Sequence, residues 1–377
     1  MLAVREGIWD RLCHERPTMI TDLTNGDVAC DSYHQWRRDI EMAEELGLQF
    51  YRLSISWPRL LPSGFPNHIS EDAKNYYSNL IDGGWTNPLI VDWFVDYARV
   101  AYTIFGDRVK WWITINEPLI ICDVVYSTAI LAPPILSPDI GAHLCSKNVV
   151  MAHAKAYRLY DEEFRSKYHG KVSLANHHVW FDPLTPADAE LAELARENCV
   201  GKYAHPIYSK AGGWPPALEK ALGEYYSKLG YSKPVLPPFT QQEIEYVRDE
   251  GTTLQQHKSK SQLSMENYEL HNIPSRFFFF QVHPEGIRRQ LVWLKQQYGD
   301  IEYVITENGL STEGGLDDQD RIDYYRKYLR QVSNKFGLYE VDFNDPMRTR
   351  TPRASANFYS NLIKTRTLDL GTIQDEL

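Results

Sequence analysis

Hydrophobic residues recur along the chain with two spacings, that of an α-helix and that of a β-strand, and segments of the two kinds alternate. Predicted helices cover residues 32–47, 71–82, 88–105, 284–298 and 318–332, with a further helix around Ala152, Ala156 and Leu159. Predicted strands cover residues 49–57, 109–115, 171–180, 301–306 and 337–343. This alternation is typical of a parallel α/β fold, and we expect a single domain over residues 1–377.

The predicted strand 49–57 has two unlike faces. Four apolar residues from Tyr51 to Trp57 fall on one face, whereas Arg52 and two serines fall on the other. Because both faces of a barrel strand are covered, the second face predicts a polar interior. An arginine buried without a counter-charge is very costly, so we expect Arg52 to have a carboxylate partner.

The alternation breaks at three places where a strand is expected. The helix 71–82 leads directly into the helix 88–105, and the polar stretch 251–272 offers no strand. Near residue 333 the chain passes from a helix straight to its last predicted strand. The run FFFF at 277–280 fits a short buried strand or a loop packed under the barrel better than an aromatic cofactor box.

Composition and charge exclude several classes of partner. The net charge is −10 and no Lys/Arg cluster stands out, which disfavours nucleic acid and anionic membrane surfaces as partners. No apolar stretch approaches the length of a membrane span, and the first residues show no secretory leader. The final Gln-Asp-Glu-Leu is a weak endoplasmic-reticulum retrieval signal. The five cysteines show no metal-binding spacing, so we expect buried free thiols and neither a metal nor a cofactor.

Two glutamates, Glu117 and Glu307, each end a predicted hydrophobic strand and begin a turn. In a parallel barrel the carboxyl ends of the strands gather on one face, where catalytic groups are found. Two carboxyl groups are what acetal hydrolysis requires, one to protonate the leaving oxygen and one to attack or stabilise the sugar carbon. A single glutamate at a strand end is more often a solvated end or a cap, but the equivalent placement of two favours the paired reading.

The segments around these glutamates, TINEP (114–118) and ITENG (305–309), resemble the two catalytic signatures of glycoside hydrolase family 1, the β-glucosidase family. Further stretches agree with the family: residues 32–64, 152–164, 316–329 and 336–363. The last of these resembles the animal branch, which includes lactase-like and insect digestive enzymes. The resemblance implies a (β/α)8 TIM barrel and a retaining β-glycosidase, acting on small β-glucosides, β-galactosides or oligosaccharides without a cofactor.

The resemblance also assigns roles to individual residues. Glu117 corresponds to the general acid/base, which must hold a proton near neutral pH, and Glu307 corresponds to the nucleophile. Asn116 corresponds to the residue that binds the sugar 2-hydroxyl, and Arg52 to the residue that keeps the nucleophile ionised. Asn176 corresponds to a residue on the aglycone side, although a satisfied core amide is an equal alternative. His177 and His178 match no catalytic position, and we expect them to be exposed or simply packed.

Four segments of the family pattern have no recognisable counterpart. They are barrel strands 1, 3, 6 and 8, expected before residue 7, after Ile81, after Gly251 and after Val332. Three of these places coincide with the breaks in alternation, so the barrel is expected to be incomplete through missing internal segments. Those segments carry most of the groups that grip the sugar. The alternative function is therefore a catalytically impaired or inactive pseudo-enzyme, or a truncated product of a family 1 gene.

Overall fold

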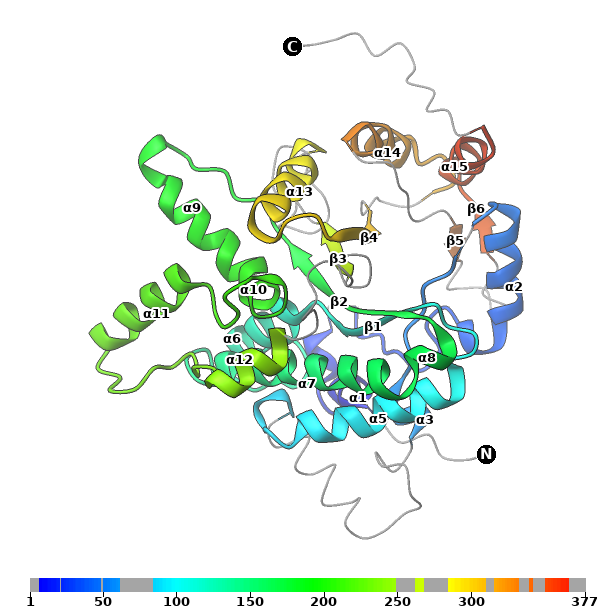
Figure 1. The fold of residues 1–377 in the computed structure, drawn as a ribbon. Helices are drawn as coiled ribbons and strands as arrows, with labels where there is room; N and C mark the ends of the chain where they lie inside the picture. The colour runs from blue at the N-terminus through cyan, green and yellow to red at the C-terminus, as the bar shows by residue number, and fades with distance from the viewer. Residues whose placement is uncertain are drawn as a thin grey trace. The chain divides into compact units, whose positions relative to one another are not determined.

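The computed structural model describes residues 7–20, 22–48, 50–61, 84–248, 262–267, 284–309, 315–331, 339–341 and 350–365 (Figure 1). The chain groups into two compact units. The first contains residues 1–24, 55–266 and 291–306, and the second contains residues 25–54, 267–290 and 307–377. The helix 71–82 and the FFFF run predicted from the sequence lie outside the described residues.

Four strands form a sheet in the order β1-β2-β3-β4. Their bounds are β1 Trp111–Asn116, β2 Lys171–His178, β3 Gln262–Asn267 and β4 Glu302–Asn308. β1 pairs with β2 in parallel, with Trp111 opposite Lys171, and the register shifts between Ile113 and Asn116. Three of the predicted strands, 109–115, 171–180 and 301–306, are thus present. All of β2 except Lys171 is buried, as expected for a strand covered on both faces.

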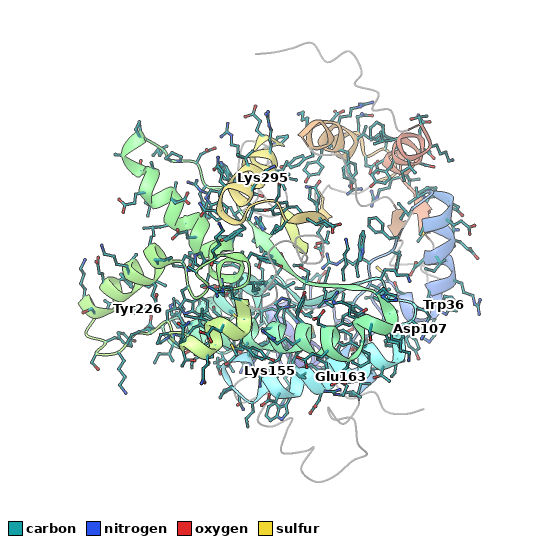
Figure 2. The ribbon with its side chains drawn as sticks, in the orientation of Figure 1. Trp36, Asp107, Lys155, Glu163, Tyr226 and Lys295 are labelled. Carbon is teal, nitrogen blue, oxygen red and sulfur yellow. A yellow bond between two sulfur atoms is a disulfide. The ribbon has the colours of Figure 1, made fainter. Side chains whose placement is uncertain are left out.

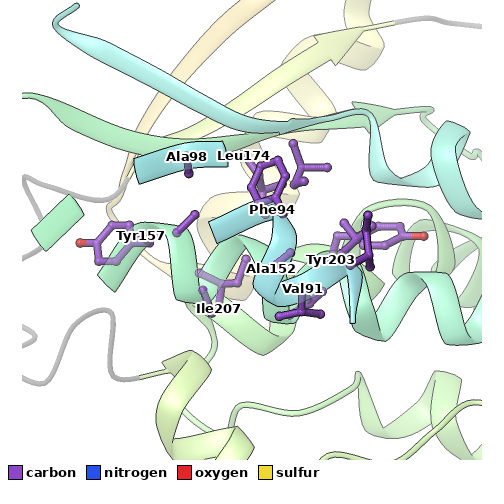
Figure 3. Close-up of a cluster of buried hydrophobic side chains, with 14 of the residues drawn as sticks. Val91, Phe94, Ala98, Ala152, Tyr157, Leu174, Tyr203 and Ile207 are labelled. Atoms are coloured by element: carbon purple, nitrogen blue, oxygen red, sulfur yellow. The ribbon is translucent and has the colours of Figure 1, made fainter. Parts of the chain in front are cut away.

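Two helices of the first unit pack against each other and against this sheet. α5 (Ile90–Phe105) lies beside α7 (Gly141–Glu163), and α7 contacts both β1 and β2 (Figure 1). The predicted apolar stripe of α5 is buried at Val91, Phe94, Ala98 and Ala101. Alanines 152 and 156 give α7 a smooth surface, which lets neighbouring elements approach closely. Figure 3 shows this core, in which α5, α7, β2 and α10 (Lys202–Tyr208) all contribute side chains.

Charged residues on the outer sides of the same two helices add cross-links between them. Lys155 of α7 lies 2.5 Å from Asp92 of α5, and Arg99 of α5 forms an ion pair with Glu163 at the end of α7 (Figure 2). These side chains are well exposed, so each pair contributes little stability, about 0–1 kcal/mol. Burial of the apolar stripe therefore dominates the packing of α5 on α7.

The remaining helices of the first unit are short or peripheral. They are α1 Ile8–Glu15, η1 Pro17–Met19, α3 Trp57–Leu60, η2 Gly84–Thr86, η3 Ile120–Val124, α6 Val125–Thr128, α8 Arg165–Tyr168, η4 Pro186–Asp188, α9 Ala189–Arg196, η5 Glu197–Gly201, α11 Pro216–Lys228 and α12 Gln241–Arg248. η3 and η5 are single π-helical turns, a feature that often marks functional sites. α13 (Pro284–Tyr298) spans the boundary between the units and places Trp293 and Leu294 in a second apolar cluster with Cys199.

The second unit contains α2 (Ser32–Glu45), α14 (Gln319–Gln331), α15 (Ala354–Thr365) and the antiparallel pair β5 (Tyr339–Val341) and β6 (Arg350–Pro352). α14 packs on α15, with Tyr325 and Tyr359 buried between them. α2 ends as predicted at Gly47, whose φ of +74° is a conformation that glycine adopts without strain. In the predicted stripe of α2, Leu46 is buried, whereas Trp36 and Ile40 are about half exposed.

Three predictions from the sequence are wrong. Residues 50–56 form no strand; they are extended coil that leads into α3, and Tyr51 and Leu53 are exposed. Alternating apolar residues show which face a segment can bury, but a strand also requires a paired neighbour, and none of the described pairings involves residues 50–56. The stretch 251–272 does contain a strand, β3, although most of its residues are polar. The expectation of free thiols fails at Cys122 and Cys145, which form a buried disulfide.

Candidate active site

Glu117 follows β1 directly and lies in a strained backbone conformation. Its φ is +44°, in the left-handed region that residues with a side chain rarely adopt. Its N–H donates to the carbonyl of Ala175 on β2 at 2.8 Å, which extends the sheet pairing by one residue. The buried Pro118 then begins the helical segment that contains η3. The turn thus points Glu117 away from the direction of β1 at a backbone cost of about 1–3 kcal/mol.

The carboxyl group of Glu117 is held by a histidine on the neighbouring strand. Nδ1 of His177 lies 2.6 Å from Oε1 of Glu117. The His177 side chain is only 4% exposed, and the Glu117 side chain is 19% exposed. One side of the carboxyl group is therefore fixed inside the protein, while part of it remains open to solvent.

The next residue of β2, His178, is also buried but faces the opposite side of the strand. Burial lowers the pKa of His178 to about 3, and the neighbouring His177 adds to this effect. His178 is therefore neutral in the folded protein at ordinary pH. The expectation that the two histidines are exposed or merely packed is right for the packing of both. It misses the contact that His177 makes.

The segment after Glu117 is anchored by a buried ion pair. Asp123, in η3, forms an ion pair with the fully buried Lys202 at the start of α10. Tyr203 donates a hydrogen bond to the other carboxylate oxygen of Asp123 at 2.7 Å, and Asn198 lies 3.4 Å from the ammonium group. Together with the Cys122–Cys145 disulfide, these contacts fix η3 to α7 and α10. The turn that carries Glu117 is thereby given a rigid support.

In the second unit, Glu307 is the partner of Arg52. Nη1 of Arg52 donates to Oε1 of Glu307, although residues 50–56 are not a strand. The side chains are 29% and 41% exposed, so the pair is open to solvent on one side. Asn308, which follows Glu307 at the end of β4, is buried, and its amide nitrogen has no hydrogen-bond partner among the described residues.

The two other predicted substrate-binding residues have different settings. Asn116 is exposed at the end of β1, where the shift in register against β2 changes the direction in which the side chains point. Asn176 is fully buried, and neither its amide oxygen nor its nitrogen has a hydrogen-bond partner in the described part of the chain. A satisfied core amide, the alternative expected from the sequence, is therefore not what the structure shows. A buried amide that makes no hydrogen bond is costly unless a ligand or water completes it.

Sequence reasoning missed two features of this site. His177 has no motif that identifies it, because its contact with Glu117 depends on the register between β1 and β2. The Asp123–Lys202 pair joins residues on two separate turns, and only the single lysine in an otherwise apolar helix start hinted at it.

In the described ranges, no three His, Cys, Asp or Glu side chains are arranged to hold a metal ion. No described helix is long and apolar enough to cross a membrane.

Comparison with known proteins gives a consistent match. The sequence profile described as glycosyl hydrolase family 1 matches residues 4–83 and 82–335. Myrosinase 1 of Brevicoryne brassicae is 35% identical, over 96% of this chain and 93% of the relative. The human cytosolic β-glucosidase is 29% identical, with the same coverage of both chains. Among solved structures, aphid myrosinase superposes with a TM-score of 0.83 at 33% identity, over 95% of this chain and 93% of the other.

A β-glucosidase from Thermotoga maritima in complex with deoxynojirimycin gives a TM-score of 0.78 at 26% identity, over 98% and 95% of the two chains. The fold class is therefore the (β/α)8 barrel, as the sequence predicted. The alignment with the Brevicoryne relative runs over 436 residues, more than the 377 of this chain, so the relative has stretches with no counterpart here. The profile match itself divides at residues 82–83, beside Ile81, where the sequence predicts a missing segment.

Proposed function

Because this chain belongs to glycosyl hydrolase family 1, we propose that it is a retaining β-glycosidase that hydrolyses terminal β-linked glucosides or galactosides by double displacement. In this reaction a carboxylate attacks the anomeric carbon while a carboxylic acid protonates the leaving oxygen. The same acid then acts as a base and activates the water that releases the sugar. The substrate is a small β-glycoside or oligosaccharide.

The observation that carries the proposal is the difference in setting between the two glutamates. Glu307 lies beside a guanidinium group, which supports a negative charge on the attacking carboxylate. The carboxyl group of Glu117 has a different neighbour, the ring of His177, whose Nδ1 contacts one carboxyl oxygen. Unlike environments for two carboxyl groups are how one site separates nucleophile from acid. Glu307 is therefore the proposed nucleophile and Glu117 the proposed acid/base.

The other predicted residues take supporting roles. Asn116 is proposed to bind the sugar 2-hydroxyl, a contact that strengthens in the transition state. Arg52 is proposed to hold and charge-balance Glu307. Asn176 is proposed to line the aglycone side, and its buried amide, which has no hydrogen-bond partner among the described residues, supports a polar ligand there.

A chromogenic assay tests the proposal. The purified chain is incubated with 4-nitrophenyl β-D-glucoside and β-D-galactoside, beside the variant Glu307→Gln and the control Glu302→Gln. Glu302 lies on the same strand but pairs with Lys171, so its replacement leaves the proposed nucleophile in place. We expect turnover by the wild type and by Glu302→Gln, and none by Glu307→Gln. Turnover by Glu307→Gln equal to that of the wild type would contradict the proposal, and a wild type that turns over neither glycoside would favour the pseudo-enzyme.

A further inference from the structure

Strand β2 holds Glu117 at two points on one edge. The carbonyl of Ala175 accepts the Glu117 N–H at 2.8 Å, and the ring of His177, two residues along, contacts the Glu117 carboxyl group at 2.6 Å. The backbone contact lies in the plane of the sheet and the ring of His177 lies on one face of it, so Glu117 is held through both its backbone and its side chain. This double contact holds a residue whose φ of +44° is otherwise unfavourable.

His177 itself is fixed from behind. Its side chain is 4% exposed, and the thiol of Cys199, in η5, lies 3.6 Å from its backbone carbonyl. Burial raises the pKa of the Cys199 thiol to about 12, so this group stays a neutral donor. The backbone of His177 is thus held by η5, and the burial of its ring leaves it little freedom to turn away from Glu117.

Resting on the proposed function, we propose that His177 is a positioning residue for the general acid. In this role Nδ1 carries the ring proton and donates a hydrogen bond to Oε1, both while the acid is protonated on Oε2 and after Glu117 has become a carboxylate. Oε2 is the oxygen that delivers the proton to the glycosidic oxygen in this proposal.

The chemical consequence follows from the change in charge on Glu117. As the bond between C1 and the leaving oxygen breaks, its electron pair goes to that oxygen, which takes the proton from Oε2, while Glu307 forms the new bond to C1. Glu117 becomes a carboxylate, and the hydrogen bond from His177 strengthens, since bonds to charged acceptors are stronger. An interaction that is stronger in the transition state accelerates the step.

Leaving-group dependence separates this role from a structural one. A poor leaving group needs the proton from Glu117, whereas 2,4-dinitrophenolate departs with little help. We expect His177→Leu to lower kcat/KM about tenfold for phenyl β-D-glucoside, but less than about twofold for 2,4-dinitrophenyl β-D-glucoside. His177→Asn, which restores a nitrogen donor near the same place, is expected to recover most of the loss.

His178→Leu is the matched control, because it makes the same substitution one residue along, on the face away from Glu117. An equal loss on both glycosides, a His177→Asn variant as slow as His177→Leu, or an equal defect in His178→Leu would overturn the inference. If the wild type hydrolyses neither glycoside, the proposed function fails instead, and the inference is decided by a measurement that needs no turnover.

That measurement is the 15N NMR spectrum of the histidine rings. The His177 signals are assigned by their absence in His177→Asn. We expect Nδ1 to carry the proton, and its shift to change in Glu117→Gln but not in Glu302→Gln. An unprotonated Nδ1, or an Nδ1 chemical shift that does not change in Glu117→Gln, would show that the hydrogen bond on which the inference depends is absent.

Discussion

Cys122 and Cys145 are joined by a disulfide that ties the π-helical turn after Glu117 to helix α7. Both residues are fully buried, and Cys122 is adjacent to Asp123, whose carboxylate is paired with Lys202. A covalent link and a buried ion pair therefore support the same turn.

Reduction of the disulfide is expected to lower the free energy of unfolding by about 3 kcal/mol, because it frees a closed loop of chain in the unfolded state. Urea denaturation of the wild type, with and without reductant, measures the change. The variant Cys13→Ser, which removes a free thiol, provides the control and should show the same response as the wild type. If alkylation without reductant labels Cys122 and Cys145 as readily as Cys13, the disulfide is absent.

Removing one partner of the Asp123–Lys202 pair is expected to be strongly destabilising. Asp123→Asn leaves the fully buried ammonium of Lys202 without its counter-charge, at a cost of about 3–5 kcal/mol. The double variant Asp123→Asn/Lys202→Met removes that uncompensated charge and should unfold at a higher temperature than Asp123→Asn alone. A double variant less stable than Asp123→Asn would show that the charge of Lys202 is not the source of the cost.

The backbone of Glu117 lies in a conformation that lowers the stability of the folded protein. Glycine adopts the observed φ of +44° freely, whereas alanine does not, so Glu117→Gly should be more stable than Glu117→Ala by about 1 kcal/mol. Both variants lose the side chain and its contact with His177, so the comparison isolates the backbone. Thermal melts of the two proteins test this, and equal or reversed midpoints would mean that the turn is not strained.

Stability is expected to fall as the pH drops below the ordinary histidine value of 6.5. Burial lowers the pKa of His143 to about 4 and that of His178 to about 3 in the folded protein. Between these values and 6.5 the unfolded chain binds protons that the folded chain does not, so unfolding is favoured as the pH falls.

Melting temperatures measured from pH 7 down to about 4 give the slope of this effect. Carboxylates also make the melting temperature depend on pH in this range. The prediction is therefore tested by comparing the pH dependence of the wild type with that of His178→Leu. This variant should lose less stability over the same range than the wild type. An identical slope would mean that His178 is already protonated, or equally free to titrate, in the folded state.

The elements that the sequence predicted well are those whose burial is decided locally. The stripe of α5 from Val91 to Ala101 and the strands β1, β2 and β4 have apolar patterns that fit their observed burial or pairing. The end of α2 at Gly47 follows from the conformational freedom of one residue. In these cases spacing alone contains the information.

The sequence predictions fail where the structure depends on contacts with residues distant in the sequence. Residues 50–56 have a strand's alternation but no described pairing, whereas β3 is part of the sheet although most of its residues are polar. The Cys122–Cys145 disulfide joins a turn to a helix, a proximity that the cysteine spacing does not encode. The contact between Glu117 and His177 likewise depends on the register of β1 against β2. Sequence motifs identified the two glutamates, but the residues that contact Glu117 could be found only from the three-dimensional structure.

The central claim is that Glu307 attacks the sugar, and covalent trapping tests it most directly. In a 2-deoxy-2-fluoro-β-D-glucoside the fluorine slows both steps, and a dinitrophenyl leaving group speeds the first step again, so the glycosyl-enzyme forms and accumulates. Mass spectrometry of the intact chain and of its peptides then locates the sugar. We expect one added fluoroglucosyl group, on the peptide that contains Glu307, and none in Glu307→Gln. An unlabelled wild type, or a label on any other residue, would contradict it.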